Sequence, residues 1–539
     1  MLSTEYDSEK KIWFGKHCPP FYHESVSVGK ALYNALSRDY SMIAQISENN
    51  GISFTNGEIL DQMITIAGNL KTSGAQKDTV ITITALNGHL VVPTIFAGFL
   101  LGIPVNTLDP NYTVEEKIHM LRLIRPGFIF CDGNIYKDIQ QAISVVGITP
   151  KVITYNQRRS HAQFIDDYLV KTGKEASLEV SNVEASTCAL IVCSSGTTGT
   201  SKAISISHQH LLYEFGYPTF KPCEKDSRVL IFSSFSWVLG IGRLVQTTIQ
   251  GIPRIITTNK FSPELFFEIV KKHKPTHFNS SPFELMAILD HDSFHPTCFS
   301  SFREYLIPGS AVTEGVWKKL KSYISNGFVA IGYGTTETGG VAFQLPNTSK
   351  FSVGRLKPDV KLKILTHNGD HCESGRCGEL YVKPKFSFLG YYGNEITTKQ
   401  AVTSDGWIHT GDVGLMDADG DLHIIDRVKD IINYNGNTIF PLEIEQIILS
   451  HSDVKHVAVV GIPDQRKAQV PTAVVIRKDG ATVTEENIKN LVACKLPQVK
   501  HLRGGVFFVD KFPLTSTGKL LKRKLREMVV KTSGIIYRE

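Results

Sequence analysis

The chain has 539 residues, and 58 Lys and Arg against 52 Asp and Glu give a formal net charge of +6. This near-neutral balance, with 42% hydrophobic and 20% charged residues, excludes collagen-like, disordered and polybasic nucleic-acid-binding proteins. At about 100–200 residues per domain, the length predicts three or four folding units with well-filled cores. We therefore expect local motifs to carry the function, and we expect no nucleic-acid partner.

The nine cysteines are odd in number and show no repeated spacing, which indicates reduced thiols without a zinc site. The N-terminus lacks the basic and apolar regions of a secretory signal. The C-terminal residues Tyr537, Arg538 and Glu539 do not form a Ser-Lys-Leu type peroxisomal signal. These features predict a cytoplasmic protein.

Residues 79–108 contain no acidic residue, Lys or Arg, as a transmembrane segment would. Pro93 and Pro104 interrupt this stretch, however, and Asn87-Gly88 predicts a turn. Residues 80–84 alternate as a strand does, and residues 89–101 have the pattern of a helix. The stretch therefore predicts a buried βαβ unit and no transmembrane segment.

Further along the chain, short β-branched runs alternate with helical patterns, which predicts parallel sheets covered by helices. The expected strands are 128–130, 151–154, 189–192, 229–232, 254–256 and 328–331. From about residue 369 shorter strands with turns predominate, such as 378–382 and 420–425. After Asp426 the sequence predicts a helix at 441–449, strands at 457–460 and 473–476, and a domain boundary near 427–431.

The segment Cys193–Lys202, which reads Cys-Ser-Ser-Gly-Thr-Thr-Gly-Thr-Ser-Lys, follows the expected strand 189–192. Glycines let a backbone approach an anion, hydroxyls and N–H groups donate to its oxygens, and Lys202 adds a positive charge. The segment lacks the second glycine of a Walker A loop, because Ser201 stands before the lysine. It predicts a polyphosphate-binding loop of another type.

This loop and four later segments resemble, in order, the motifs of the adenylate-forming superfamily, which contains acyl-CoA synthetases, peptide-synthetase adenylation domains and beetle luciferases. The four segments are Ile331–Thr338, Trp407–Asp412, Asp426–Asp430 and Pro513–Lys519. Residues His501–Asp510 are especially similar to luciferases and to luciferase-like insect fatty acyl-CoA synthetases. The chain is also similar to 4-coumarate:CoA ligase-like enzymes, and the resemblance runs from about residue 50 to 525.

The resemblance implies an α/β fold, with an α+β C-terminal part. A large N-terminal AMP-binding domain of αβαβα sheets is expected at 1–426, including a β-rich subdomain at about 350–426. A hinge is expected at 427–430, followed by a small mobile α+β domain at 431–539 that carries the catalytic lysine. We also expect a monomer.

The implied activity is that of an ATP-dependent carboxylic acid:CoA ligase, with Mg²⁺ and coenzyme A, acting on a medium- or long-chain fatty acid or an aryl acid. The acid is activated as an acyl-AMP with release of pyrophosphate, and the acyl-CoA then forms. A luciferase-like oxygenase and a nucleotide-binding relative impaired in the thioester step are alternatives. Family resemblance also leaves a peroxisomal location open.

The resemblance assigns catalytic roles to Lys519, Thr336 and Glu337. Lys519 would contact the α-phosphate and the substrate carboxylate, and Glu337 would bind magnesium. Tyr333 offers an aromatic face to adenine, Asp412 and Arg427 would bind the ribose, and Lys429 is the expected hinge residue. The remaining nucleotide-binding residues are Ser194, Ser195, Gly196, Thr197, Thr198, Gly199, Lys202, Gly309, Ser310, Ala311 and Gly334. The expected acid pocket has an apolar lining of Trp237, Val238, Leu239, Gly240, Gly339, Gly340 and Val341.

Several positions depart from the family pattern. Trp237 stands where many relatives carry a histidine, and the phosphate loop has Ser201 and Ala203 where Pro and Gly are usual. Asn433 stands where a lysine linked to the thioester step is common, and Thr438 where a glutamine is frequent. These last two changes bear on the expected thioester step and not on adenylation.

Two further departures concern light emission. Glu214 aligns with an arginine that beetle luciferases offer to luciferin, and Gly339-Gly340 replaces a hydroxyl-bearing stretch. An acid at this place would repel a carboxylate substrate, so we expect little luciferin oxidation.

Overall fold

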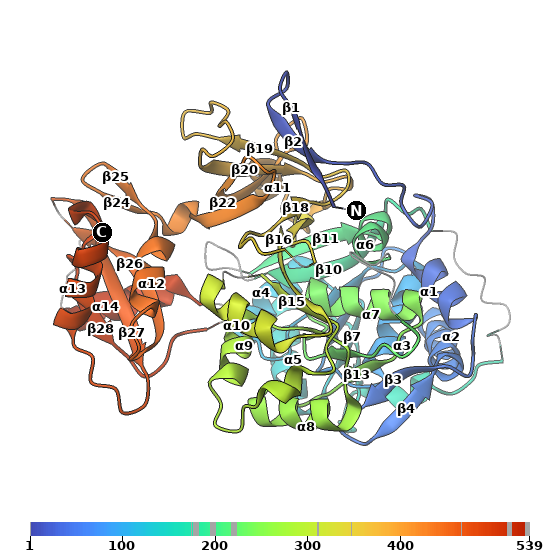
Figure 1. Cartoon of the computed structure of the whole chain (residues 1–539). Coiled ribbons are helices and arrows are strands. Elements are labelled where there is room, and N and C mark those ends of the chain that lie inside the picture. The colour runs from blue at the N-terminus through green and yellow to red at the C-terminus, as the bar shows by residue number, and fades with distance from the viewer. Residues whose placement is uncertain are drawn as a thin grey trace.

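A computed structural model describes residues 2–173, 175, 183–194, 201–216, 224–309, 312–346, 348–464, 466–514 and 520–533. Within these ranges the strands form four sheets, three of which lie in the first 427 residues. The fold is mixed α/β, as the sequence predicts. Figure 1 shows the part from β24 onward, in orange and red, to one side of the remaining chain.

Two large sheets follow the order expected of parallel α/β units, with antiparallel strands only at their edges. The first sheet has the order β21 (Gly390–Tyr391), β11 (Lys202–Ser207), β10 (Cys188–Ser194), β6 (Val105–Thr107), β5 (Ile81–Thr84), β7 (Phe128–Cys131), β8 (Lys151–Thr154), β9 (Gln163–Phe164). The second has the order β18 (Arg355–Leu356), β17 (Gly339–Phe343), β16 (Phe328–Thr335), β15 (Glu304–Pro308), β14 (His277–Asn279), β12 (Val229–Ile231), β13 (Arg254–Ile256), β3 (Ile43–Ser47), β4 (Ile52–Thr55).

Helices pack between and outside these sheets and so produce the predicted αβαβα layers. Between the sheets lie α1 (Val28–Leu36), α2 (Asn56–Thr72), α3 (Val91–Leu101), α6 (His208–Phe215) and α7 (Val238–Gln250), within one hydrophobic core. The outer layers are α4 (Val114–Ile124) and α5 (Tyr136–Val146) on one side, and α8 (Pro263–His273), α9 (Pro282–Leu289) and α10 (Glu314–Tyr323) on the other.

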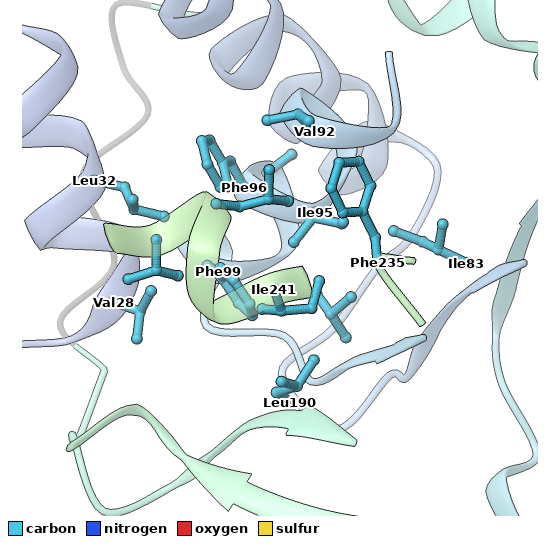
Figure 2. Packing of buried hydrophobic residues seen from close by; sticks show 14 of the residues in the cluster. Val28, Leu32, Ile83, Val92, Ile95, Phe96, Phe99, Leu190, Phe235 and Ile241 are labelled. Carbon is cyan, nitrogen blue, oxygen red and sulfur yellow. The ribbon is translucent and has the colours of Figure 1, made fainter. Parts of the chain in front are cut away.

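The central core explains the apolar stretch at 79–108. Every residue of α3 is buried, because α1, α2 and the strands β5 and β6 cover it on several sides. Figure 2 shows Phe96 and Phe99 of this helix among Val28, Leu32 and Ile241. Strand β5 and helix α3 confirm the predicted βαβ unit, although the helix begins at Val91 rather than at residue 89. Within the described ranges, none of the helices combines the length and apolar character needed to cross a membrane.

The third sheet is antiparallel and corresponds to the predicted β-rich region. Its strands are, in order, β1 (Thr4–Asp7), β2 (Ile12–Gly15), β19 (Lys361–Leu365), β20 (Gly378–Lys383), β22 (Ile408–Met416) and β23 (Leu422–Arg427). Helix α11 (Glu395–Ala401) lies between β21 and β22 in the sequence. The N-terminal hairpin β1–β2 joins this sheet through pairing of β2 with β19, which the sequence pattern did not predict.

The C-terminal part has its own sheet and its own hydrophobic core, which runs from Ile432 to Val530. Strands β25 (Asn437–Ile439), β24 (Ile432–Tyr434), β27 (Ala468–Arg477) and β26 (Val454–Asp464) lie in this order, and β28 (Val506–Phe508) pairs with β27. The helices are α12 (Pro441–Leu449), α13 (Glu485–Lys495) and α14 (Lys522–Ser533). This α+β arrangement agrees with the fold class, while a hinge at 427–430 stays a prediction.

Candidate functional site

A cavity of about 1030 Å³ lies where the carboxyl ends of strands from both large sheets meet. Ligands commonly bind at this edge of parallel sheets, because the loops that follow the strands converge there. Short loops after β12, β15 and β16 contribute much of its lining. The cavity is therefore the candidate active site.

Most of the predicted site residues meet at this cavity, although they come from distant parts of the chain. Its lining includes Lys202, Trp237, Leu239, Gly309, Tyr333, Gly334, Thr336, Glu337, Gly339, Gly340, Arg427 and Lys429. Two residues of the expected apolar set do not line it, which corrects that prediction: Gly240 packs against the backbone of Ser234, and Val341 is fully buried in the core beneath the antiparallel sheet. Val238 does line the cavity.

Several predicted residues lie outside the described part of the chain. They are Ser195, Gly196, Thr197, Thr198, Gly199, Ser310, Ala311 and Lys519. Ser194 ends β10, where its backbone pairs with Lys202 at the start of β11. The described structure therefore places the two ends of the predicted phosphate-binding segment side by side in one sheet, and Lys202 at the cavity wall.

Asp412 does not line the cavity but holds two residues that do. Its Oδ2 accepts a 2.9 Å hydrogen bond from the Tyr333 hydroxyl, and its Oδ1 lies 3.1 Å from Nε of Arg427. Burial and the Asp412 charge raise the pKa of Tyr333 well above its usual value, so the phenol remains a donor. Residues from β16, β22 and β23 thus form one polar cluster at the cavity wall.

A second cluster contains Glu337, Lys202 and a residue that the motifs did not indicate, Tyr391. The Tyr391 hydroxyl donates a 2.9 Å hydrogen bond to Oε1 of Glu337, and the Lys202 ammonium lies 4.4 Å from the centre of the Tyr391 ring. Burial and the neighbouring carboxylate raise the pKa of this phenol. No local signal identifies Tyr391, because its position depends on pairing of β21 with β11, and residues 208–389 separate these two strands in the sequence.

Asn87 and Asn279 shape the loop after β12, and sequence reasoning also missed them. Asn87 donates to the carbonyl oxygen of Ser233 at 3.0 Å and accepts from the N–H of Phe235 at 3.0 Å. Asn279 donates to the Ser233 hydroxyl at 2.9 Å. These bonds hold the turn that leads to Trp237, where helix α7 begins and the apolar part of the cavity lies.

The residues fit a site for a polyphosphate and a divalent cation. Glu337 offers one carboxylate at the cavity, and only its Oε1 accepts a hydrogen bond within the described chain. Magnesium typically takes one or two carboxylates, with phosphate oxygens and water completing its shell. A single carboxylate beside an ammonium group therefore suits Mg²⁺ bound together with a phosphate ligand.

Comparisons with known proteins identify the family to which the chain is similar. The family model described as AMP-binding enzyme matches residues 34–392, and that described as AMP-binding enzyme C-terminal domain matches residues 443–519. The chain is 28% identical to a luciferin 4-monooxygenase of Photuris pensylvanica over 97% of this chain and 99% of the relative. It is 29% identical to a probable 4-coumarate–CoA ligase 3 of Dictyostelium discoideum over 87% of this chain and 89% of the relative.

Among solved structures, ATP-bound MatB from Rhodopseudomonas palustris superimposes with a TM-score of 0.83 at 23% identity, covering 93% of this chain and 99% of that one. This likeness shows a shared fold. Because the first family model alone matches well over half of the sequence, the chain belongs to the AMP-binding enzyme family.

Proposed function

We propose that the protein is an ATP-dependent carboxylic acid:CoA ligase, acting on a medium- or long-chain fatty acid or an aryl acid. The observation that carries this proposal is that one cavity joins Lys202 and Glu337 with the apolar wall at Trp237 and Leu239. The first two suit a triphosphate with its metal, and the wall suits the hydrocarbon part of an acid. The named ligase relative in Dictyostelium supports the same class of reaction.

In the first half-reaction, a carboxylate oxygen of the acid attacks the α-phosphorus of ATP. The bond between that phosphorus and the bridging oxygen breaks, and pyrophosphate leaves with its electron pair. Catalysis then consists mainly of positioning and of stabilising negative charge. Lys202 would balance the charge of the phosphates, Thr336 would donate to the α-phosphate, and Lys519 would contact both that phosphate and the acid.

The nucleotide would lie along the cluster of Tyr333, Asp412 and Arg427. The Tyr333 ring lines the cavity and can pack against adenine. Both Asp412 oxygens have protein partners, and a carboxylate has further lone pairs that can accept from ribose hydroxyls. Glu337 would hold Mg²⁺, which supplies charge neutralisation to the phosphates when bound.

In the second half-reaction, the thiol sulfur of coenzyme A attacks the carbonyl carbon of the acyl-adenylate. The bond from that carbon to the AMP oxygen breaks, AMP leaves, and the thiol proton passes to solvent. We propose that the part from 431 to 539 turns about Lys429 between the two steps. The separate core of this part supports such a movement, because few buried contacts would have to change.

Pyrophosphate exchange with a panel of fatty and aryl acids tests the first step, and detection of acyl-CoA tests the second. We expect both with at least one acid, and loss of exchange in Lys519→Ala. Exchange without acyl-CoA would support a relative impaired in thioester formation. Light emission with luciferin, ATP and oxygen would instead support a luciferase-like oxygenase, and absence of ATP binding would overturn the assignment.

A further inference from the structure

One wall of the main cavity contains Glu214, which forms a buried ion pair with Lys357. Oε2 of Glu214 lies 2.8 Å from Nζ of Lys357, and the two side chains are 8% and 10% exposed. Glu214 comes from the last turn of α6, and Lys357 directly follows β18. Glu214 alone would repel a carboxylate substrate. Lys357 balances its negative charge and therefore weakens this repulsion.

The glycine pair at 339 and 340 makes room for this carboxylate. A Cβ at Gly339 would lie 2.6 Å from Cδ of Glu214, and Gly339 has a φ of +68°. The N–H of Gly340 donates to Oε2 of Glu214 at 2.8 Å. The acidic residue and the two glycines, which depart separately from the luciferase pattern, therefore form one structural unit with Lys357.

This unit separates two cavities. Glu214 lines both the main cavity and a second cavity of about 210 Å³, whereas Lys357 lines only the second. Residues 18–24 of the N-terminal segment, Tyr213 and Phe386 form other walls of the second cavity. An acyl chain extending past Glu214 would have to displace a paired, buried carboxylate, which is costly because it leaves charges unpaired.

The carboxylate still has hydrogen-bonding capacity toward the main cavity. Both bonds that Glu214 accepts within the described chain go to Oε2, and none goes to Oε1. His210, one helical turn earlier and 3% exposed, also lines the main cavity, and its Nδ1 has no hydrogen-bond partner among the described residues. Buried polar atoms without a partner among the described residues favour binding of a ligand that supplies a hydrogen bond.

We propose that Glu214 is a specificity-determining residue that closes the acid pocket and accepts a hydrogen bond from a donor at the far end of the substrate. The preferred substrates are then acids that stop short of the ion pair and carry a distal hydroxyl or amino group. Unsubstituted long chains are poor substrates, because their ends would meet a charged wall. This inference rests on the proposed ligase function and specifies its substrate class.

The test compares matched acids with the unmodified enzyme. Alkanoic acids are paired with ω-hydroxy acids of equal length, and ring-methyl aryl acids with ring-hydroxy aryl acids. We expect kcat/KM for pyrophosphate exchange to favour the donor-bearing member of the best pair about tenfold or more, because a site built for a donor rejects an analogue that lacks it. Equal or reversed preference would overturn the proposal.

The double variant Glu214→Leu/Lys357→Met replaces the pair with apolar groups of similar size, which avoids leaving either charge unpaired. We expect its preference for the donor to fall about tenfold and its activity with unsubstituted long-chain acids to rise, because their ends would then meet apolar groups instead of a charged wall. The matched control Glu443→Leu/Lys500→Met removes a 2.6 Å ion pair of the C-terminal part and should keep the unmodified preference. An unchanged preference in a folded Glu214→Leu/Lys357→Met protein would also overturn the proposal.

Calorimetric binding of the same acid pairs separates this inference from the proposed function. If the unmodified protein shows no exchange with any acid, the ligase assignment fails, while tighter binding of the donor-bearing acids would still support the role of Glu214. If exchange occurs but both members of each pair bind equally, only the role of Glu214 fails. The comparison on the unmodified protein also decides the matter if the double variant does not fold.

Discussion

Tyr391 donates a hydrogen bond of 2.9 Å to Glu337, and in this way an edge strand of one large sheet supports the expected magnesium ligand of the other. The same Tyr391 ring lies beneath the Lys202 ammonium at 4.4 Å. One side chain therefore contacts both Lys202 and the carboxylate of Glu337.

Tyr391→Phe removes the hydroxyl and keeps the ring under Lys202. A hydrogen bond to a charged group contributes about 1.5–3 kcal/mol, so we expect pyrophosphate exchange to fall about 10-fold to 100-fold and the Mg²⁺ concentration for half-maximal exchange to rise. Tyr391→Leu should cost more, because the cation–π contact is also lost. Tyr392→Phe is the control, and a Mg²⁺ dependence unchanged in Tyr391→Phe would contradict this role.

Asp412→Asn keeps the size of the side chain but removes the charge that Tyr333 and Arg427 contact. We expect KM for ATP to rise on the order of tenfold or more, because charge-assisted hydrogen bonds are the stronger ones. Kinetics at varied ATP concentration measure this effect. Asp419 is exposed and lies nearby in the sequence, so Asp419→Asn should leave KM for ATP unchanged. An equal rise of KM in both variants would show that the effect comes from the folding of the sheet and not from the Asp412 contacts.

The two C-terminal departures from the family pattern are cross-strand partners, since Asn433 of β24 pairs directly with Thr438 of β25. Neither residue lines the main cavity. Because a lysine linked to the thioester step is common at this position in the family, we expect Asn433→Lys to increase acyl-CoA formation. Because Asn433 lies outside the main cavity, we expect pyrophosphate exchange to change by no more than about twofold, as for surface substitutions. Parallel assays of both half-reactions check this outcome, and a large change in exchange would place Asn433 in the first step.

Gly29 allows α1 to approach α3 closely, because an added Cβ would lie 2.2 Å from the carbonyl oxygen of Phe99. We expect Gly29→Ala to lower the free energy of unfolding by about 1–3 kcal/mol through overpacking. Gly315→Ala, in α10, meets nothing within 4 Å and should instead raise it by about 0.5–1 kcal/mol through helix propensity. Denaturant unfolding of the two variants shows whether packing or helix propensity determines the change in the free energy of unfolding at each position.

His208 is buried and accepts a hydrogen bond from the N–H of Val28 at 3.3 Å. Burial lowers the pKa of His208 from its ordinary value of 6.5 to about 4. Between these values the unfolded chain binds a proton that the folded protein does not, so the free energy of unfolding falls as pH decreases. The slope is about 1.4 kcal/mol per pH unit from this group, or about 3 kcal/mol in total.

Unfolding measured at several pH values should therefore show a shallower dependence between pH 6.5 and 4 for His208→Gln than for the unmodified protein. An identical slope in both proteins would assign the acid sensitivity to other groups. His273 is a suitable comparison, because it contacts Glu48 near the surface rather than lying in the core.

Much of the architecture follows from local patterns. The apolar run at 128–130 predicts a buried strand and the stretch at 89–101 predicts a helix, and the structure has the strand Phe128–Cys131 and the helix Val91–Leu101 at these places. The ordered motifs likewise indicated Lys202, Tyr333, Glu337 and Arg427, because those residue types suit a polyphosphate and a nucleotide wherever they meet.

Tertiary structure decided what no single segment contains. The sequence places Glu214 and Lys357 far apart, and only the approach of α6 to β17 and β18 makes them an ion pair beside the main cavity. Tyr391 reaches Glu337 only because β21 pairs with β11. Periodicity reports which face of an element is buried, whereas the partner of a buried charge depends on how distant elements pack, and this packing determines the shape and chemistry of the site.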